Sequence, residues 1–160
     1  MTTKVITAKE GMTLIRDTYK AYLDGVEPTT ETAETIAFLV RNDIQLRDFM
    51  LGMPCEYHND ITTYGAFLET TINAVGDINK AYPLLTILSM FYFTAGESDM
   101  AKVAINDVLE TNGNYSLAKL LNRVYLSNAP VEMFSSMVGE LHPKVVSGLE
   151  GEYGNTEVTE

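Results

Sequence analysis

The sequence contains one cysteine, few basic residues and no long apolar run. A single cysteine, Cys55, excludes an internal disulfide and is typical of proteins in a reducing cytoplasm. No apolar run is long enough to span a bilayer, and the first residues, MTTKVITAKEG, lack the apolar segment of a secretory signal. The sequence therefore predicts a cytoplasmic protein that makes no contact with a membrane.

Basic residues are scarce relative to acidic ones. The chain has 11 Lys and Arg against 22 Asp and Glu, which gives a formal net charge of −11. Direct binding to a nucleic-acid backbone needs clustered cations, so we expect none. An acidic surface permits a basic protein partner, although such surfaces also keep many small domains in solution.

Motifs for phosphate, dinucleotide or calcium binding are absent, as is the Glu-x-x-His pair of di-iron bundles. The one group of reactive residue types is Cys55, His58 and Asp60, in a predicted loop over residues 53–60. It has neither a nucleophile signature nor an oxyanion site, and it offers too few ligands for structural zinc. The second histidine, His142, is expected at a helix end.

We accordingly predict that the protein is not an enzyme. No catalytic, cofactor-binding or metal-binding residues are assigned, and no cofactor is expected. The residues that bind a partner, and the oligomeric state, are left open.

Apolar residues recur at helical spacing, and no stretch alternates as a strand does. With 160 residues and 46% apolar content, the chain is long enough to bury a core without metal or crosslinks. We predict an all-α fold, an antiparallel bundle of seven or eight helices joined by short loops. Residues 1–150 are assigned to a single helical domain. Residues 151–160 have little apolar surface and are assigned to a flexible tail.

Four helices are predicted before residue 77. Thr7 and Glu10 form a capping box for the first, which extends to about Asp24. Residues 29–32 open the second, the third ends before Gly52, and the fourth begins near residues 60–62. Their apolar faces comprise Met12, Ile15, Tyr19, Tyr22 and Leu23; Ala33, Ile36, Ala37 and Val40; Ile44, Leu46, Phe49 and Met50; and Tyr64, Phe67, Leu68, Thr71, Ile72 and Val75.

Residues 83–125 are predicted to form three amphipathic helices separated by two tight turns. Pro83 suits the first turn of the first helix, and Gly96 suits its end. Ser98 is the predicted N-cap of the second helix, whose buried residues are expected to be Met100, Ala101, Ala104, Ile105, Val108 and Leu109. After residue 130 a short helix follows, which Gly139 and Pro143 are expected to interrupt, and then a weak helical turn.

The first two of these helices resemble a tetratricopeptide repeat. The residues in matching register are Leu85, Leu88, Ser89, Tyr92, Gly96 and Ala101. The resemblance implies a helical hairpin whose helices cross closely at Ala101. Gly113 stands where the repeat usually has proline, and no second copy of similar quality occurs, so the chain is not expected to form a repeat array.

A broader stretch, Ile36 to Leu51 and Tyr82 to Glu132, is similar to the C-terminal half of an uncharacterised domain family. The matching residues are Arg47, Asp48, Gly96, Tyr115, Leu117, Ala118, Leu120 and Leu121. Members occur in actinobacteria and some of their phages and have no assigned activity. The resemblance implies a helical fold and is compatible with a phage-encoded protein.

Three functions remain compatible with the sequence. The first is a non-catalytic helical interaction module that binds a protein or peptide in an apolar groove. The second is an acidic inhibitor, or decoy, that blocks the basic site of a nucleic-acid-binding host protein. The third is an enzyme whose site is assembled only in the fold. An apolar groove favours the module, a carboxylate-rich face the decoy, and a buried titratable cluster the enzyme.

Overall fold

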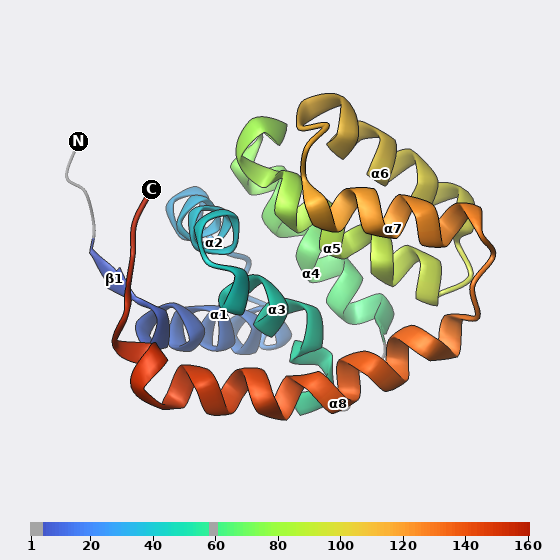
Figure 1. Cartoon of the computed structure of the whole chain (residues 1–160). Coiled ribbons are helices and arrows are strands. Elements are labelled where there is room, and N and C mark those ends of the chain that lie inside the picture. The colour runs from blue at the N-terminus through green and yellow to red at the C-terminus, as the bar shows by residue number, and fades with distance from the viewer. Residues whose placement is uncertain (1–4, 58–60) are drawn as a thin grey trace.

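The computed structural model describes residues 5–57 and 61–160, and within these ranges it contains eight α-helices (Figure 1). The all-α prediction is confirmed. The elements are β1 (Ile6–Thr7), α1 (Ala8–Leu23), α2 (Thr30–Asn42), α3 (Ile44–Gly52), η1 (Met53–Glu56), α4 (Ile61–Val75), α5 (Ile78–Thr94), α6 (Ser98–Thr111), α7 (Ser116–Leu126), α8 (Val131–Glu150), η2 (Glu152–Asn155) and β2 (Glu157–Val158), where η marks a 3₁₀ helix. None of the helices in these ranges has the length and apolar character needed to cross a bilayer.

Helix α1 begins at the predicted capping box. The hydroxyl of Thr7 accepts a 3.2 Å hydrogen bond from the Glu10 backbone, and the Glu10 carboxylate accepts a 3.0 Å bond from the Thr7 backbone. The helix ends where Gly25 adopts a positive φ of 92°. That conformation lets the backbone N–H of Val26 donate to the carbonyl of Ala21 at 2.8 Å, as in a Schellman motif.

Helices α5 and α6 form a hairpin at the centre of the fold. Gly96 has a φ of 84°, and the Glu97 N–H donates to the Tyr92 carbonyl at 2.8 Å, which closes α5 as the sequence predicts. Ala101 on α6 is fully buried. Helix α5 also contacts α2, α4, α7 and α8, so its side chains form the middle of the core.

The start of α5 differs from the prediction. The helix begins at Ile78 after Asp77, whose carboxylate caps the N–H of Asn79 at 2.9 Å, so Pro83 lies inside the helix and not in its first turn. Proline leaves the carbonyl four residues earlier, that of Asn79, without its helical donor. Burial of Ala81 and Pro83 against the core keeps this turn helical in spite of that loss.

The start of α6 also differs. Its N-cap is Glu97 and not Ser98, and the cap side chain makes no hydrogen bond to the described residues. Met100, which was expected to be buried, has 46% of its surface exposed. The helix begins at Ser98, one residue earlier than the assumed cap implies, and Met100 lies in its first turn, where the side chain remains half exposed.

Helix α8 is one continuous helix of 20 residues, so the predicted interruption is wrong. Gly139 and Pro143 both lie within it. They are four positions apart, and the carbonyl that Pro143 cannot bond therefore belongs to a residue without a side chain, where water reaches it easily. Buried side chains along the whole length, Phe134 and Leu149 among them, hold the helix against the rest of the fold. In Figure 1 α8 runs from the end of α7 past α3 to α1.

Residues 151–160 are not a flexible tail. Strand β2 pairs antiparallel with β1, with Val158 opposite Ile6, and Val158 is buried. The hydroxyl of Tyr153 donates a 2.7 Å hydrogen bond to Asp43, the N-cap residue of α3. The composition of this segment predicted disorder because its apolar residues are few, but those it has are packed against α1 and α3.

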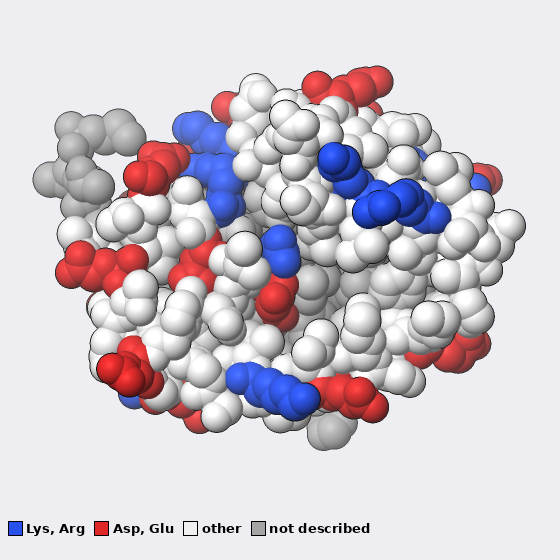
Figure 2. Space-filling model, viewed as in Figure 1, with Lys and Arg blue, Asp and Glu red and all other residues white. Residues whose placement is uncertain are grey.

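Charge is unevenly distributed on the face shown in Figure 2. Basic side chains lie over α7, while the surface between α7 and α8 is hollowed and mostly uncharged.

Candidate functional site

Cys55 lies at the surface in η1. Partial burial raises the pKa of its thiol, and the nearby Glu56 carboxylate raises it further. Because the thiolate is the reactive form, this thiol is a weak nucleophile at neutral pH. His58 and Asp60, the other members of the predicted group, lie outside the described residues.

Cys55 borders a small apolar pocket between η1, α4, α5 and α8. Its volume is about 130 Å³, below the roughly 300 Å³ of pockets that hold drug-sized ligands. Within residues 5–57 and 61–160, no three His, Cys, Asp or Glu side chains are placed to hold a metal ion.

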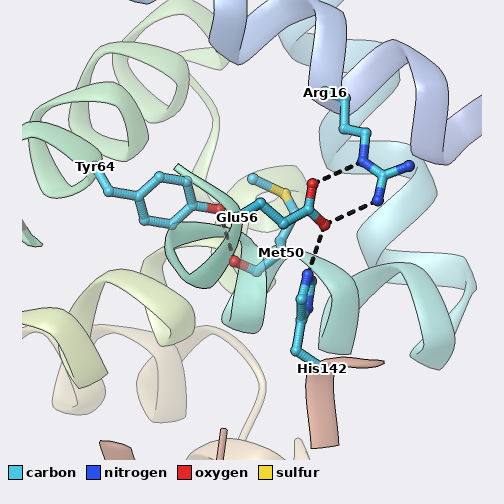
Figure 3. Close-up of polar contacts among 5 residues, drawn as sticks. All are labelled: Arg16, Met50, Glu56, Tyr64 and His142. Atoms are coloured by element: carbon cyan, nitrogen blue, oxygen red, sulfur yellow. Dashed lines mark hydrogen bonds and ion pairs between the residues drawn. The ribbon is translucent and has the colours of Figure 1, made fainter. Parts of the chain in front are cut away.

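Three residues from distant parts of the chain meet at Glu56 (Figure 3). Arg16 of α1 donates from Nε and Nη2 to the two carboxylate oxygens of Glu56, at 2.9 Å each. His142 of α8 pairs through Nε2 with Oε2 of Glu56 at 2.6 Å. We call these three residues the Glu56 cluster; it connects α1, η1 and α8.

His142 is not at a helix end, contrary to the prediction. It lies in the middle of α8, with 5% of its surface exposed. Its Nδ1 is buried and has no hydrogen-bond partner among the described residues. It rests on the backbone of Gly52, where an added Cβ would lie 2.3 Å from Nδ1. There is thus no room for a ligand at this nitrogen.

The electrostatics of the Glu56 cluster favour a structural role. Burial alone would raise the pKa of Glu56, but the hydrogen bonds and charges of Arg16 and His142 outweigh burial and lower it. The same carboxylate keeps the pKa of Arg16 above its usual value. A carboxylate that accepts three hydrogen bonds is a poor general base. The arrangement holds three segments together and supplies no reactive group.

Two further contacts fix the surroundings of the Glu56 cluster. The Arg16 guanidinium lies 5.1 Å from the centre of the Phe49 ring, which also packs on His142 at 5.5 Å. The buried hydroxyl of Tyr64 donates a 2.6 Å hydrogen bond to the carbonyl of Met50, which joins α4 to α3 (Figure 3). Burial raises the pKa of Tyr64 well above its usual value.

The sequence analysis missed the Glu56 cluster because its members are far apart. Glu56 is 40 positions from Arg16 and 86 positions from His142. No local spacing rule joins such residues. The one available signal was an isolated histidine within an apolar series, Val138 to Leu149.

Arg47 and Asp48, two of the residues that carry the family resemblance, form an ion pair of 3.0 Å on α3. Arg47 is largely buried beside Tyr115, whose ring packs edge-on against Tyr82 at 5.0 Å. Burial raises the pKa of Tyr115, and the Arg47 charge partly offsets this. These contacts join α3, α5 and the start of α7.

The clearest exposed apolar feature is a row on α8. Met133, Met137 and Leu141 follow one another at intervals of four residues, with 63%, 49% and 48% of their surfaces exposed. Phe134 lies next to this row and is buried, with its ring 5.7 Å from that of Phe93 on α5. The row therefore begins at the edge of the core and continues into solvent.

A second apolar row lies on α7. Leu117 and Val124 are half-buried against the core, and Leu120, which shares their face, is 50% exposed. Figure 2 shows the surface hollowed between α7 and α8. We call the two rows and this hollow the α7–α8 surface: Leu117, Leu120, Val124, Met133, Met137 and Leu141.

Comparisons with known proteins assign no family to the chain. No family model, no curated protein and no solved structure matches it. The two resemblances noted in the sequence therefore stay predictions.

Proposed function

We propose that the protein is a non-catalytic helical interaction module that binds an apolar segment of a protein partner at the α7–α8 surface. The observation that carries this proposal is the exposed row Met133, Met137 and Leu141 on α8. Flexible thioether side chains adapt to the shape of a partner, and methionine is common at such binding surfaces.

The energy of apolar burial indicates how much of the surface must take part. Fully burying one Leu or Met side chain contributes about 1.5–3 kcal/mol, so completing the burial of three half-exposed ones contributes roughly 2–5 kcal/mol. Micromolar affinity requires about 8 kcal/mol. The partner must therefore also contact the α7 row and form polar contacts at the edges.

The chemistry of the polar groups supports a role without catalysis. In the Glu56 cluster the carboxylate is neutralised by Arg16, and His142 has no space for a substrate at Nδ1. Cys55 has a raised thiol pKa. The resemblance of the α5–α6 hairpin to a tetratricopeptide repeat supports the same function, because such hairpins bind peptides.

A decoy for a basic, nucleic-acid-binding host protein is the second candidate. The net charge of −11 favours it, as does the resemblance to a family found in actinobacterial phages. The basic side chains over α7 make the α7–α8 surface itself a poor place for a basic partner (Figure 2). In both proposals the protein acts in the cytoplasm and does not bind nucleic acid directly.

Affinity capture with matched variants tests the proposal. The bait is the full chain, either unchanged or carrying Met133→Ser, Met137→Ser and Leu141→Ser. The control carries Met100→Ser and Val103→Ser, which remove exposed apolar side chains from α6. We expect the unchanged chain and the control to capture a protein that the α8 variant does not capture. After purification, this protein should bind the unchanged chain directly.

Calorimetry of the purified pair should show a negative heat-capacity change, the mark of apolar burial. Capture that is equal for all three baits would contradict the proposed surface. A partner that is lost only in high-salt washes, and whose capture is unchanged by the α8 variant, would favour the decoy.

A further inference from the structure

We infer that the segment bound at the α7–α8 surface is an amphipathic helix with an acidic flank, which lies against α7. This inference rests on the proposed function and adds the chemistry of the partner. It follows from the charges around the two apolar rows and from the shape of the hollow.

Helix α7 is basic although the chain as a whole is acidic. Its 11 residues, SLAKLLNRVYL, include Lys119 and Arg123 and no carboxylate. Both cations are exposed, and neither forms an ion pair with any residue in the described ranges. In Figure 2 the basic side chains lie over α7, with uncharged side chains between them and the hollow. Two unpaired cations beside apolar side chains favour a partner that brings carboxylates.

The spacing of these cations fits a helical partner. Lys119 and Arg123 are four residues apart on one helix, so they lie side by side, and the exposed Leu120 follows Lys119 directly in sequence. A partner helix with carboxylates at the same spacing presents them as a similar pair. Its apolar residues at positions i, i+3 or i+4, and i+7 then meet the rows on α7 and α8.

The charges on the α8 side of the surface determine how the partner helix is oriented. Lys144 continues the direction of the apolar row, but Glu132 and Glu140 precede it at the same helical spacing, so this edge has no net positive charge. The uncompensated positive charge is on α7 alone. The acidic flank is therefore expected against α7, with the apolar face of the partner against Met137 and Leu141.

Other occupants fit less well. An extended strand needs a free sheet edge, and the one sheet in the described residues, β1–β2, lies at the opposite end of α8 from Met133. A second copy of the chain would bring its own α7 cations or the mixed charges of its α8. Nucleic acid needs a wider cluster of cations than two.

Selection from a displayed peptide library tests the inference. The library presents helices of about 18 residues, or five turns, with a fixed Leu face and both flanks randomised among Glu, Lys and Ser. The helices are first selected on the unchanged full chain. They are then tested against the double variant Lys119→Glu, Arg123→Glu. Lys9→Glu with Lys20→Glu, two exposed cations of α1, is the matched charge control.

We expect selected helices with Glu on one flank. An exposed ion pair changes a dissociation constant by about two- to fivefold, so reversal of both α7 cations should weaken binding at least tenfold, and the α1 control should change it less than twofold. Binding should also weaken between about 0.01 and 0.15 M salt, because the Debye length shortens from about 30 to 8 Å.

The outcomes separate this inference from the proposed function. The selected helices could instead have Lys or Ser flanks and bind the Leu141→Ser chain more weakly than the unchanged chain. That result would overturn the acidic flank and leave the proposed interaction surface standing. Failure to select any helix, or binding indifferent to both the α7 and α8 variants, would overturn both. Self-association of the chain that Leu141→Ser abolishes would replace the peptide by a second copy.

Discussion

His142 of α8 and Glu56 of η1 share a 2.6 Å hydrogen bond although they are 86 positions apart. Arg16 completes the pairing from α1. This contact holds α8 in place at its middle, while Phe134 and Leu149 hold it nearer its ends. Because the proposed binding row lies on the same helix, the Glu56 cluster also determines where that row stands relative to α7.

Removing the histidine should destabilise the fold. His142→Ala removes a buried ring and leaves Glu56 with one donor fewer, so we expect a loss of about 2–4 kcal/mol in the free energy of unfolding. Lys144→Ala, an exposed change two residues away, should stay within about 0.5 kcal/mol. Urea titrations measure both. In a double-mutant cycle with Glu56→Gln, a coupling near zero would show that the contact is not formed in solution.

Stability should depend on the ionisation of Glu56. Its pKa is lower in the folded protein than in the unfolded chain, so its contribution is present above the unfolded-state pKa and is lost as pH falls through the folded-state pKa. The urea midpoint should therefore drop between about pH 5 and pH 3, and drop less for Glu56→Gln.

The hydrogen bonds of Glu10 to Thr7 also lower its pKa, so Glu10 also makes stability fall with falling pH. Glu10 is unchanged in the Glu56→Gln variant, so its contribution is the same in both proteins. Parallel pH profiles for the two proteins would contradict the role of Glu56.

Two glycines test the close approach of α3 and α8. Gly52→Ala places a methyl group against the His142 ring, so we expect a loss of about 1–3 kcal/mol from overpacking. Gly139→Ala meets no described atom within 4 Å and should stabilise α8 by about 0.5–1 kcal/mol. Thermal unfolding compares them. Equal and small effects would show that Gly52 and His142 are not in contact.

The C-terminal segment should contribute to stability. Tyr153→Phe removes the hydrogen bond to the buried Asp43, and we expect a loss of about 1–2 kcal/mol. Amide hydrogen exchange should quicken at the start of α3, which Asp43 caps. Tyr22→Phe, a change of the same kind on α1, serves as the control. Unchanged exchange at Leu46 would mean that residues 151–160 leave the fold in solution.

Local sequence rules predicted the elements that local interactions determine. Thr7 with Glu10 marked the start of α1, and Gly25 and Gly96 marked two helix ends, because capping bonds and positive φ angles involve residues close in sequence. The same rules failed at Pro83 and Pro143. There, burial of the surrounding helix offsets a local preference against helix, and burial is not visible in a short window.

The candidate site could be predicted less well than the helices. The exposure of Met137 and Leu141 depends on which face α8 turns toward α3 and α5, and that is not visible in the local sequence. The Glu56 cluster depends on contacts over 40 and 86 positions. The ordering of Tyr153 and Val158 likewise needs partners at the other end of the chain, Asp43 and Ile6.

Site-specific photo-crosslinking tests the central claim most directly. A benzophenone side chain is placed at Met137 on α8 or, as the control, at Met100 on α6, both exposed, and the chain is irradiated with its captured partner. We predict crosslinks from position 137 to one segment of the partner, and none from position 100. Crosslinks from position 100 alone, or equal yields at both positions, would contradict binding at the α7–α8 surface.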